Sequence, residues 1–219
     1  MAPAEPDAGE FTILYFGDSH IDTAVQTDEI VTMCDYIADH AGDLSIEMVL
    51  FGGDITDSID GHPVELAAFV TALGALVDVP HLLAIGNHDY DSPGVARDRT
   101  VFNANFPQAY YTGMAWWSGG FYDGFADNAY LLRTIEGVDY IFIALEFFPR
   151  QGVIDWADAL LTTYAARRAI IVTHAYEYSD NTPYSVGDPF GPDVYPECGV
   201  DYHWGDEVWT ELLLSLIHI

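Results

Sequence analysis

Short apolar runs alternate with helix-like patterns in the first half of the chain. Residues 11–16, 46–51 and 79–85 are apolar and β-branched runs, and a glycine follows each of them. These runs predict three buried strands. Residues 27–40 and 64–77 carry apolar positions at helical spacing, and Pro63 suits the first turn of the second helix. This alternation of strands and helices predicts parallel pairing within a buried sheet.

The second half of the chain mixes strands with long polar and aromatic loops. Residues 129–135 and 138–145 predict two strands joined as a hairpin at Glu136-Gly137. A helix is expected over 154–167, a strand over 169–172 and a short helix from Asp206. Residues 91–127 and 181–205 are rich in aromatic, Gly and Pro residues and predict ordered loops. Trp116 and Trp117, in the first loop, fit either a substrate cap or plain core packing.

Four polar clusters each come directly after a predicted strand. In a parallel sheet the C-terminal strand ends lie along one edge, so we expect these side chains to converge on a single crevice. Carboxylate, imidazole and amide oxygen form a mixed ligand set that suits Mn, Fe or Zn. The clusters are Asp18-Ser19-His20, Gly52-Gly53-Asp54, Gly86-Asn87-His88-Asp89 and Thr173-His174.

The ordered set of clusters resembles the signature of the calcineurin-like metallophosphoesterase superfamily over about residues 11–177. That signature reads Asp-X-His, Gly-Asp, Gly-Asn-His-Asp/Glu and then a lone His. The resemblance implies an α/β fold, a four-layer α/β/β/α sandwich with the active site at the C-terminal strand ends. Taken singly, the same residues also fit structural roles: Asp18 as a helix cap, Asn87 as a turn residue and His174 as a core histidine.

The resemblance also implies a centre of two divalent or trivalent metal ions. Asp18 and His20 would hold the first ion, Asn87 and His174 the second, and Asp54 would bridge both. Two such ions can bind phosphate oxygens and generate a hydroxide for in-line attack on phosphorus. The implied activity is therefore hydrolysis of a small-molecule phosphomonoester or phosphodiester.

The resemblance gives two further residues a part in the reaction. His88 would protonate the leaving oxygen or neutralise phosphate charge, and the carboxylate of Asp57 would orient His88. Asp89 is left with no role beyond bracing its loop. Two alternatives stay open: a nucleotide or cyclic-nucleotide phosphodiesterase, and a noncatalytic metal- or protein-binding module on the same scaffold.

Charge narrows the classes of partner. The chain has 35 acidic residues and six basic ones, all Arg, for a formal net charge of −29. This composition argues against binding a nucleic-acid duplex or an anionic membrane surface, since both need a basic footprint. It favours a substrate of small charge. Arg97 and Arg99 lie near a motif and could grip a phosphate, but their acidic neighbours favour ion pairing.

Other features bear on the compartment. No apolar run reaches the roughly 18 residues of a membrane span, so we expect a soluble protein. Residues 1–10 show no signal-peptide pattern, although export stays open if the chain begins elsewhere. Cys34 and Cys198 match no metal or redox spacing and are expected to be two unpaired thiols. The oligomeric state is left open.

The pattern divides the chain into three parts: an N-terminal tail over 1–10, one phosphoesterase-like domain over 11–213 and a tail over 214–219. The family's last block, Gly-His-X-His, is missing. Residues 214–219 match a translation of a transposon end used in DNA library preparation, so we expect an artefactual tail on an incomplete domain and give His218 no metal role. A genuine apolar strand is the alternative. An incomplete domain would lack two metal ligands.

The acidic surface predicts a protein adapted to high salt. The free energy of unfolding in urea should rise as NaCl is raised from about 0.1 M to about 1 M, because the screening length falls from about 10 Å to about 3 Å. Equilibrium unfolding followed by circular dichroism at several salt concentrations measures this. A stability that does not change with salt would contradict the prediction.

Overall fold

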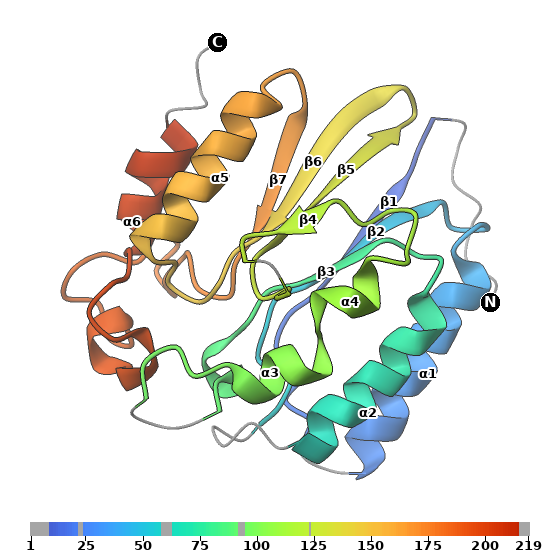
Figure 1. Ribbon diagram of the computed structural model, residues 1–219, viewed down its shortest axis with the longest axis horizontal. Coiled ribbons are helices and arrows are strands. Elements are labelled where there is room, and N and C mark those ends of the chain that lie inside the picture. The colour runs from blue at the N-terminus through green and yellow to red at the C-terminus, as the bar shows by residue number, and fades with distance from the viewer. Residues whose placement is uncertain (1–8, 22–23, 58–62, 92–94, 123, 215–219) are drawn as a thin grey trace.

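Two β-sheets lie face to face at the centre of the molecule (Figure 1). The structure is a computed structural model that describes residues 9–21, 24–57, 63–91, 95–122 and 124–214. The first sheet has the order β1-β2-β3, all parallel, from β1 (Thr12–Phe16), β2 (Ile46–Phe51) and β3 (His81–Leu83). The strand predicted over 79–85 is shorter than expected, because Pro80 has no N–H to donate to a ladder.

The second sheet has the order β4-β5-β6-β7. Its strands are β4 (Gly119–Gly120), β5 (Ala129–Ile135), β6 (Val138–Ala144) and β7 (Arg168–Val172). β6 and β7 pair in parallel, and β5 and β6 form the predicted antiparallel hairpin. Glu136 and Gly137 both have positive φ, 48° and 75°, as a tight two-residue hairpin turn requires.

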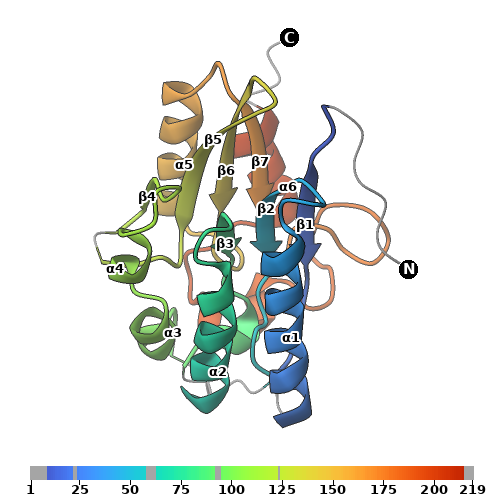
Figure 2. The same ribbon diagram turned by 90° about the vertical axis from the view of Figure 1, so that its right-hand side faces the viewer.

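Helices cover the outer face of each sheet. α1 (Ala24–His40) and α2 (Pro63–Leu73) lie over the first sheet, whereas α5 (Gln151–Thr163) and α6 (Gly205–Val208) lie over the second (Figures 1 and 2). A short π-helix, Trp209–Leu213, continues α6. The predicted α/β class and four-layer α/β/β/α sandwich are therefore confirmed. In Figure 2 the arrowheads of β1, β2, β6 and β7 point the same way.

Side-chain alternation along β6 explains why its buried part, from Tyr140 to Ala144, is apolar. Phe142 and Ala144 face the core between the sheets, while Ile141 and Ile143 face the core under α5. Successive side chains of a strand point to opposite faces, so a strand with both faces covered is apolar at every position. β6 is thus an interior strand of the second sheet, between β5 and β7, with both of its faces covered.

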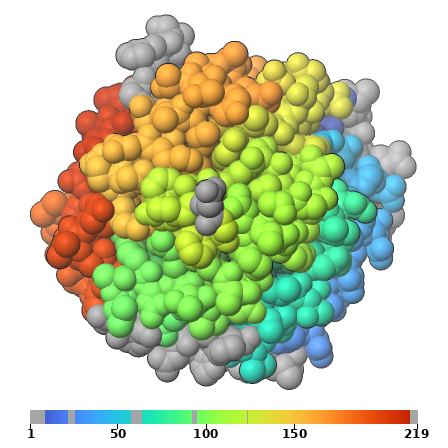
Figure 3. All heavy atoms as spheres, in the orientation of Figure 1, coloured from blue at the N-terminus to red at the C-terminus, as the bar shows by residue number. Residues whose placement is uncertain are grey.

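The long segment between β3 and β5 packs against the side of the sandwich. It contains α3 (Thr100–Asn105) and α4 (Gln108–Tyr111), and its green atoms form a continuous surface in Figure 3. Trp116 is buried, donates its indole N–H to the Val77 carbonyl (3.0 Å) and packs on His81 at 4.7 Å between ring centroids. Trp117 stacks on Tyr111. Both tryptophans pack in or against the core, and the substrate-cap interpretation is not supported.

Other sequence-based expectations can be compared with the described residues. Cys34 and Cys198 are both unpaired and buried, as expected, and burial raises the pKa of each thiol to about 12. Among the described residues, no helix combines the length and apolar character that crossing a membrane requires. Apart from residues 9, 10 and 214, the tails predicted over 1–10 and 214–219 lie outside the described part of the chain.

Glu146 is a fully buried carboxylate just after β6 that gathers three arginines. Arg150 donates from Nε and Nη2 to its two oxygens at 2.7 and 2.8 Å, and Arg97 and Arg99 lie 3.9 and 3.6 Å away. Burial raises the pKa of this carboxyl, but the hydrogen bond from Arg150 and the nearby positive charges outweigh it and hold the pKa below its usual value. Half of the chain's six arginines therefore lie around this carboxylate, and Arg99 also pairs with the buried Asp127 at 2.6 Å. The ion pairing expected for Arg97 and Arg99 is confirmed.

This cluster joins loops that are distant in sequence. The Arg97 guanidinium donates to the carbonyls of Phe147 (2.6 Å) and Phe148 (2.7 Å) and to that of Asp201 (3.1 Å). The Thr173 hydroxyl donates to the Glu146 carbonyl at 3.1 Å. These hydrogen bonds connect the segments that follow the C-terminal ends of β3, β6 and β7.

Replacing Glu146 by Gln should lower the free energy of unfolding at pH 7 by about 3–5 kcal/mol, because it leaves buried guanidinium groups without their counter-charge. The ordinary pKa of a Glu carboxyl is 4.5, and folding lowers the pKa of Glu146. The ionised carboxylate therefore stabilises the folded protein when the pH is above 4.5, and this stabilisation is lost as the pH falls through the lower, folded-state pKa. The difference between wild type and E146Q should therefore narrow below about pH 4.5. Urea unfolding across pH measures both effects.

The matched control for this prediction is E47Q. Glu47 pairs with Arg133 at 2.8 Å, but both side chains are about a third exposed. A pair of this kind is worth about 1 kcal/mol or less. Equal losses in E146Q and E47Q at pH 7 would contradict the role given to the buried cluster.

Candidate metal centre

A pocket of about 350 Å³ opens at the C-terminal strand ends. β1, β2, β3 and β7 each deliver at least one polar side chain to it, so the four clusters converge as the sequence predicts. Their residues in the pocket lining are Asp18, His20, Asp54, Asn87, His88 and His174.

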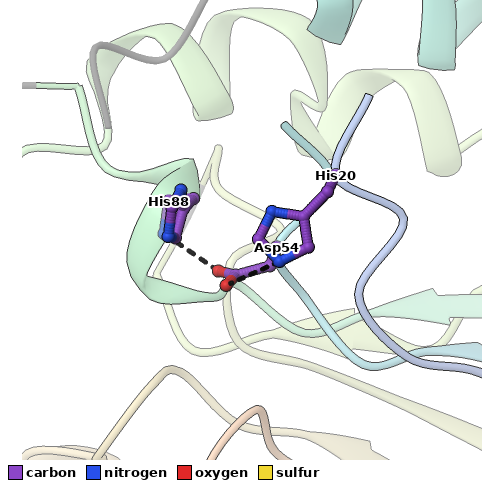
Figure 4. Close-up of side chains that lie close together, drawn as sticks. All are labelled: His20, Asp54 and His88. Atoms are coloured by element: carbon purple, nitrogen blue, oxygen red, sulfur yellow. Dashed lines mark hydrogen bonds and ion pairs between the residues drawn. The ribbon is translucent and has the colours of Figure 1, made fainter. Parts of the chain in front are cut away.

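Asp54 lies at the centre of these side chains and is 4% exposed. Its Oδ2 is 3.2 Å from Nε2 of His174 and 3.7 Å from Nε2 of His20, while Oδ1 accepts the backbone N–H of His88 at 2.9 Å. In Figure 4 the carboxylate lies between His20 and His88. Burial raises the pKa of Asp54, but hydrogen bonding and charge from His174 outweigh it and lower the pKa overall.

Two glycines allow this crowding. Gly53 has a φ of 100°, and a side chain there would collide with the backbone of Gly86. A Cβ on Gly86 would in turn collide with the carboxylate of Asp54. Asp54 itself has a φ of 49° and His20 one of 42°, conformations that non-glycine residues rarely adopt. Backbone strain of this kind concentrates at functional sites.

His174 is positioned by its backbone and side-chain neighbours. Its Nδ1 lies 3.0 Å from the Gly52 carbonyl, which can only accept, so Nδ1 carries the proton of that hydrogen bond. Nε2 then faces the side-chain oxygens of Asn87 (3.1 Å) and Asp54. Burial lowers the pKa of His174, but the hydrogen bond and charge of Asp54, together with Asp18, raise it to about 9. The surrounding oxygens therefore favour a positive charge at this position.

Two groups of three residues could each hold a metal ion, and both groups include Asp54. Within each group the three potential ligand atoms lie within 4.8 Å of one another. One group consists of Asp18, Asp54 and His174, and the other of His20, Asp54 and His88. The sequence-based assignment pairs Asp18 with His20 and leaves His88 outside the ligands. The shared carboxylate is the same in both descriptions.

The structure corrects the expected role of Asp57. Its carboxylate was predicted to orient His88, but it lies 3.1 Å from Nδ1 of His20 instead. His88 Nδ1 bonds to the backbone carbonyl of Asp57 at 2.6 Å. The loop after β2 brings this carbonyl rather than the side chain to His88, so Asp57 contacts both imidazoles through different oxygens.

Asp89 has a larger structural role than the sequence suggests. It is fully buried and accepts the backbone N–H groups of Ile55 (2.8 Å), Thr56 (3.3 Å) and Gly86 (2.9 Å). These bonds join the loop after β2 to the loop after β3. Burial, with the neighbouring charge of Asp54, raises its pKa to about 6.

His40, His81 and His203, the described histidines outside the four clusters, do not line the pocket. His203 is buried, with its ring nitrogens 3.0 Å from the Pro149 carbonyl and 3.1 Å from the side-chain oxygen of Gln151. His81 is enclosed in the core, where burial lowers its pKa to about 4. Both have structural roles.

Sequence reasoning missed the other wall of the pocket. Its lining side chains follow β6 and β7, in segments identified from sequence only as strand end and loop. The sequence indicated this wall only through the many aromatic residues in 181–205. Their number does not show which ring faces the site. They are Phe147, Ala175, Glu177, Tyr184, Phe190 and Tyr195.

Comparison with known proteins agrees with this geometry. The family model described as calcineurin-like phosphoesterase matches residues 11–214, nearly the whole chain. A search of curated proteins gave no match. The family match supports metal-dependent phosphoester hydrolysis as the general activity. On this evidence the chain belongs to the calcineurin-like phosphoesterase family.

Proposed function

We propose that the chain hydrolyses a phosphomonoester or phosphodiester at a centre of two metal ions. In this proposal Asp18 and His20 hold one ion, Asn87 and His174 hold the other, and Asp54 belongs to both. Mn, Fe and Zn all suit such a donor set. His88 donates a proton to the leaving oxygen.

The observation that carries the proposal is the crowding of electron-pair donors around Asp54. With the Nδ1 proton of His174 directed to Gly52, a neutral ring presents the lone pair of Nε2 to two oxygens at 3.1 and 3.2 Å. Such a group of acceptors is stable only with a cation among them, either a proton or a metal ion. The residues therefore fit a bound metal.

When bound, two such ions neutralise phosphate oxygens and lower the pKa of water between them. The chain's own residues orient the reaction. The Asp57 carbonyl fixes the His88 ring through Nδ1, which leaves Nε2 as the nitrogen that can give its proton to the departing alkoxide. The Asp57 carboxylate lies 3.1 Å from Nδ1 of His20, where its charge would help to orient the ring once the other nitrogen binds a metal ion.

Metal content tests the shared role of Asp54. The purified protein, dialysed against Mn²⁺ and analysed by elemental mass spectrometry, should carry two ions per chain. D54N should carry fewer than one, because it removes the ligand common to both ions. The matched control is D57N: it should still carry two ions with about 10- to 100-fold weaker affinity, because Asp57 only orients a ligand. One ion per wild-type chain would contradict the two-metal proposal.

Replacing His88 by Asn tests the proton donor. Turnover of an alkyl phosphate should fall by about 100- to 10,000-fold while two ions are retained. The loss should be much smaller for p-nitrophenyl phosphate, whose leaving group needs no protonation. Steady-state kinetics on both substrates, with metal analysis of the same samples, measures this.

The control for that variant is H40N, at the end of α1 and away from the pocket. It should match wild type on both substrates. Loss of a metal ion in H88N would make His88 a ligand, and equal losses on the two substrates would remove it as the proton donor. Retained metal with no turnover in the wild type would favour a noncatalytic module.

A further inference from the structure

The wall of the pocket that faces the metal-ligand side chains is aromatic. Phe147 packs against His174 with ring centroids 5.6 Å apart and meets Tyr195 edge-on at 5.1 Å. Tyr184 and Phe190 line the same pocket. Among the described residues, the lining contains no aliphatic side chain apart from Ala175. A substrate whose phosphate reaches the metal ligands must therefore place its remaining atoms against aromatic rings.

A short hairpin after β7 holds one of these rings. Tyr184 N–H donates to the Tyr176 carbonyl at 2.9 Å, and Tyr178 N–H donates to the Thr182 carbonyl at 2.7 Å. The Tyr184 ring packs on Phe148 at 5.3 Å, and its backbone is fixed before any ligand binds. Glu177 belongs to the same hairpin, where it pairs with Pro183, and this residue also lines the pocket.

Phe190 is presented to solvent at the pocket by a fixed backbone. Its side chain is 64% exposed, which costs free energy unless a ligand covers it. Its φ is 62°, a conformation that persists only where the surroundings enforce it. The next residue, Gly191, lies flat against the buried indole of Trp204, where a Cβ would collide. The exposure is therefore built into the loop.

The described lining of the pocket contains no arginine. Arg97, Arg99 and Arg150 surround Glu146, and Arg133 pairs with Glu47. Arg167 lies near Asp139, and Arg168 begins β7 at the end opposite the site. Glu177 adds a carboxylate instead. An anionic group beyond the reacting phosphate would meet repulsion here rather than a partner.

We propose that the pocket selects a phosphoester whose reacting phosphate carries an uncharged aromatic ring, with that ring packed against Phe190, Tyr184 and Tyr195. Aromatic pairs gain stability beyond the area they bury, so an aromatic group is preferred over a saturated one of equal size. Glu177 disfavours substrates with a second negative charge. The inference rests on the proposed function, because the metal ions would place the phosphate.

Binding of non-hydrolysable ligands tests the ring preference without relying on turnover. Isothermal titration calorimetry of the Mn²⁺-loaded protein compares benzylphosphonate with cyclohexylmethylphosphonate, which have equal charge and similar size. Benzylphosphonate should bind about two- to tenfold more tightly. F190L should remove most of that ratio, whereas Y36L, which changes an exposed aromatic on α1, should keep it.

The charge preference is tested with 4-carboxybenzylphosphonate, which adds one negative charge at the far end of the ring. At low salt it should bind about fivefold more weakly than benzylphosphonate. E177Q, which keeps the shape of the side chain and removes its charge, should abolish most of this difference. No difference in the wild type would overturn the role of Glu177.

The outcomes separate this inference from the proposed function. Equal affinities for benzyl- and cyclohexylmethylphosphonate overturn the ring preference even if the enzyme hydrolyses phosphoesters. An unchanged ratio in F190L overturns the assignment of the contact to Phe190. Benzyl phosphate that is bound but never hydrolysed, together with the predicted ratios, would refute the hydrolytic function and support the recognition.

Discussion

The arrangement of the site depends on the ion pairs that the buried carboxylate of Glu146 makes with arginines. Three guanidinium groups surround this carboxylate, and one of them, on Arg97, also holds the carbonyls of Phe147 and Phe148. Phe147 in turn packs on His174. Burying this many charges is costly unless each is paired, so the cluster forms only when all its loops are in place. These loops therefore become ordered in the same cooperative step in which the sandwich folds.

Most of the fold was predictable because its signals are local. The apolar runs, the Glu136-Gly137 turn and the polar clusters after each strand are all readable within windows of a few residues. The division into two sheets was not readable in this way. It depends on which face of β6 packs against which layer, and both faces are equally apolar. Only the resemblance to a family supplied that division.

The site was predictable to the extent that its residues follow strands directly. Asp18, Asp54, Asn87 and His174 lie together because parallel strands end at one edge. Which oxygen of Asp57 meets His88 was not predictable. The residue has both a backbone carbonyl and a side-chain carboxylate, and only the conformation of the loop decides that the carbonyl meets His88 and the carboxylate lies near His20. The roles of Glu146 and Asp89 were hidden for a related reason: each is one acidic residue among 35 until burial distinguishes it.

The placement of positive charge links the acidic composition to the chemistry. With arginines engaged around Glu146 and along the second sheet, the described pocket is lined by acceptors, carboxylates and aromatic rings. Such a lining offers a phosphate few positive groups, because the histidine rings are the only side chains in the described lining that can carry a positive charge. In the proposed mechanism, bound metal ions would therefore supply most of the attraction for the phosphate. The raised pKa of His174, about 9, reflects the same demand, because its oxygen neighbours hold a proton where a metal ion would otherwise sit. The aromatic wall is then left to distinguish one phosphoester from another by the shape and charge of the group that the phosphate carries.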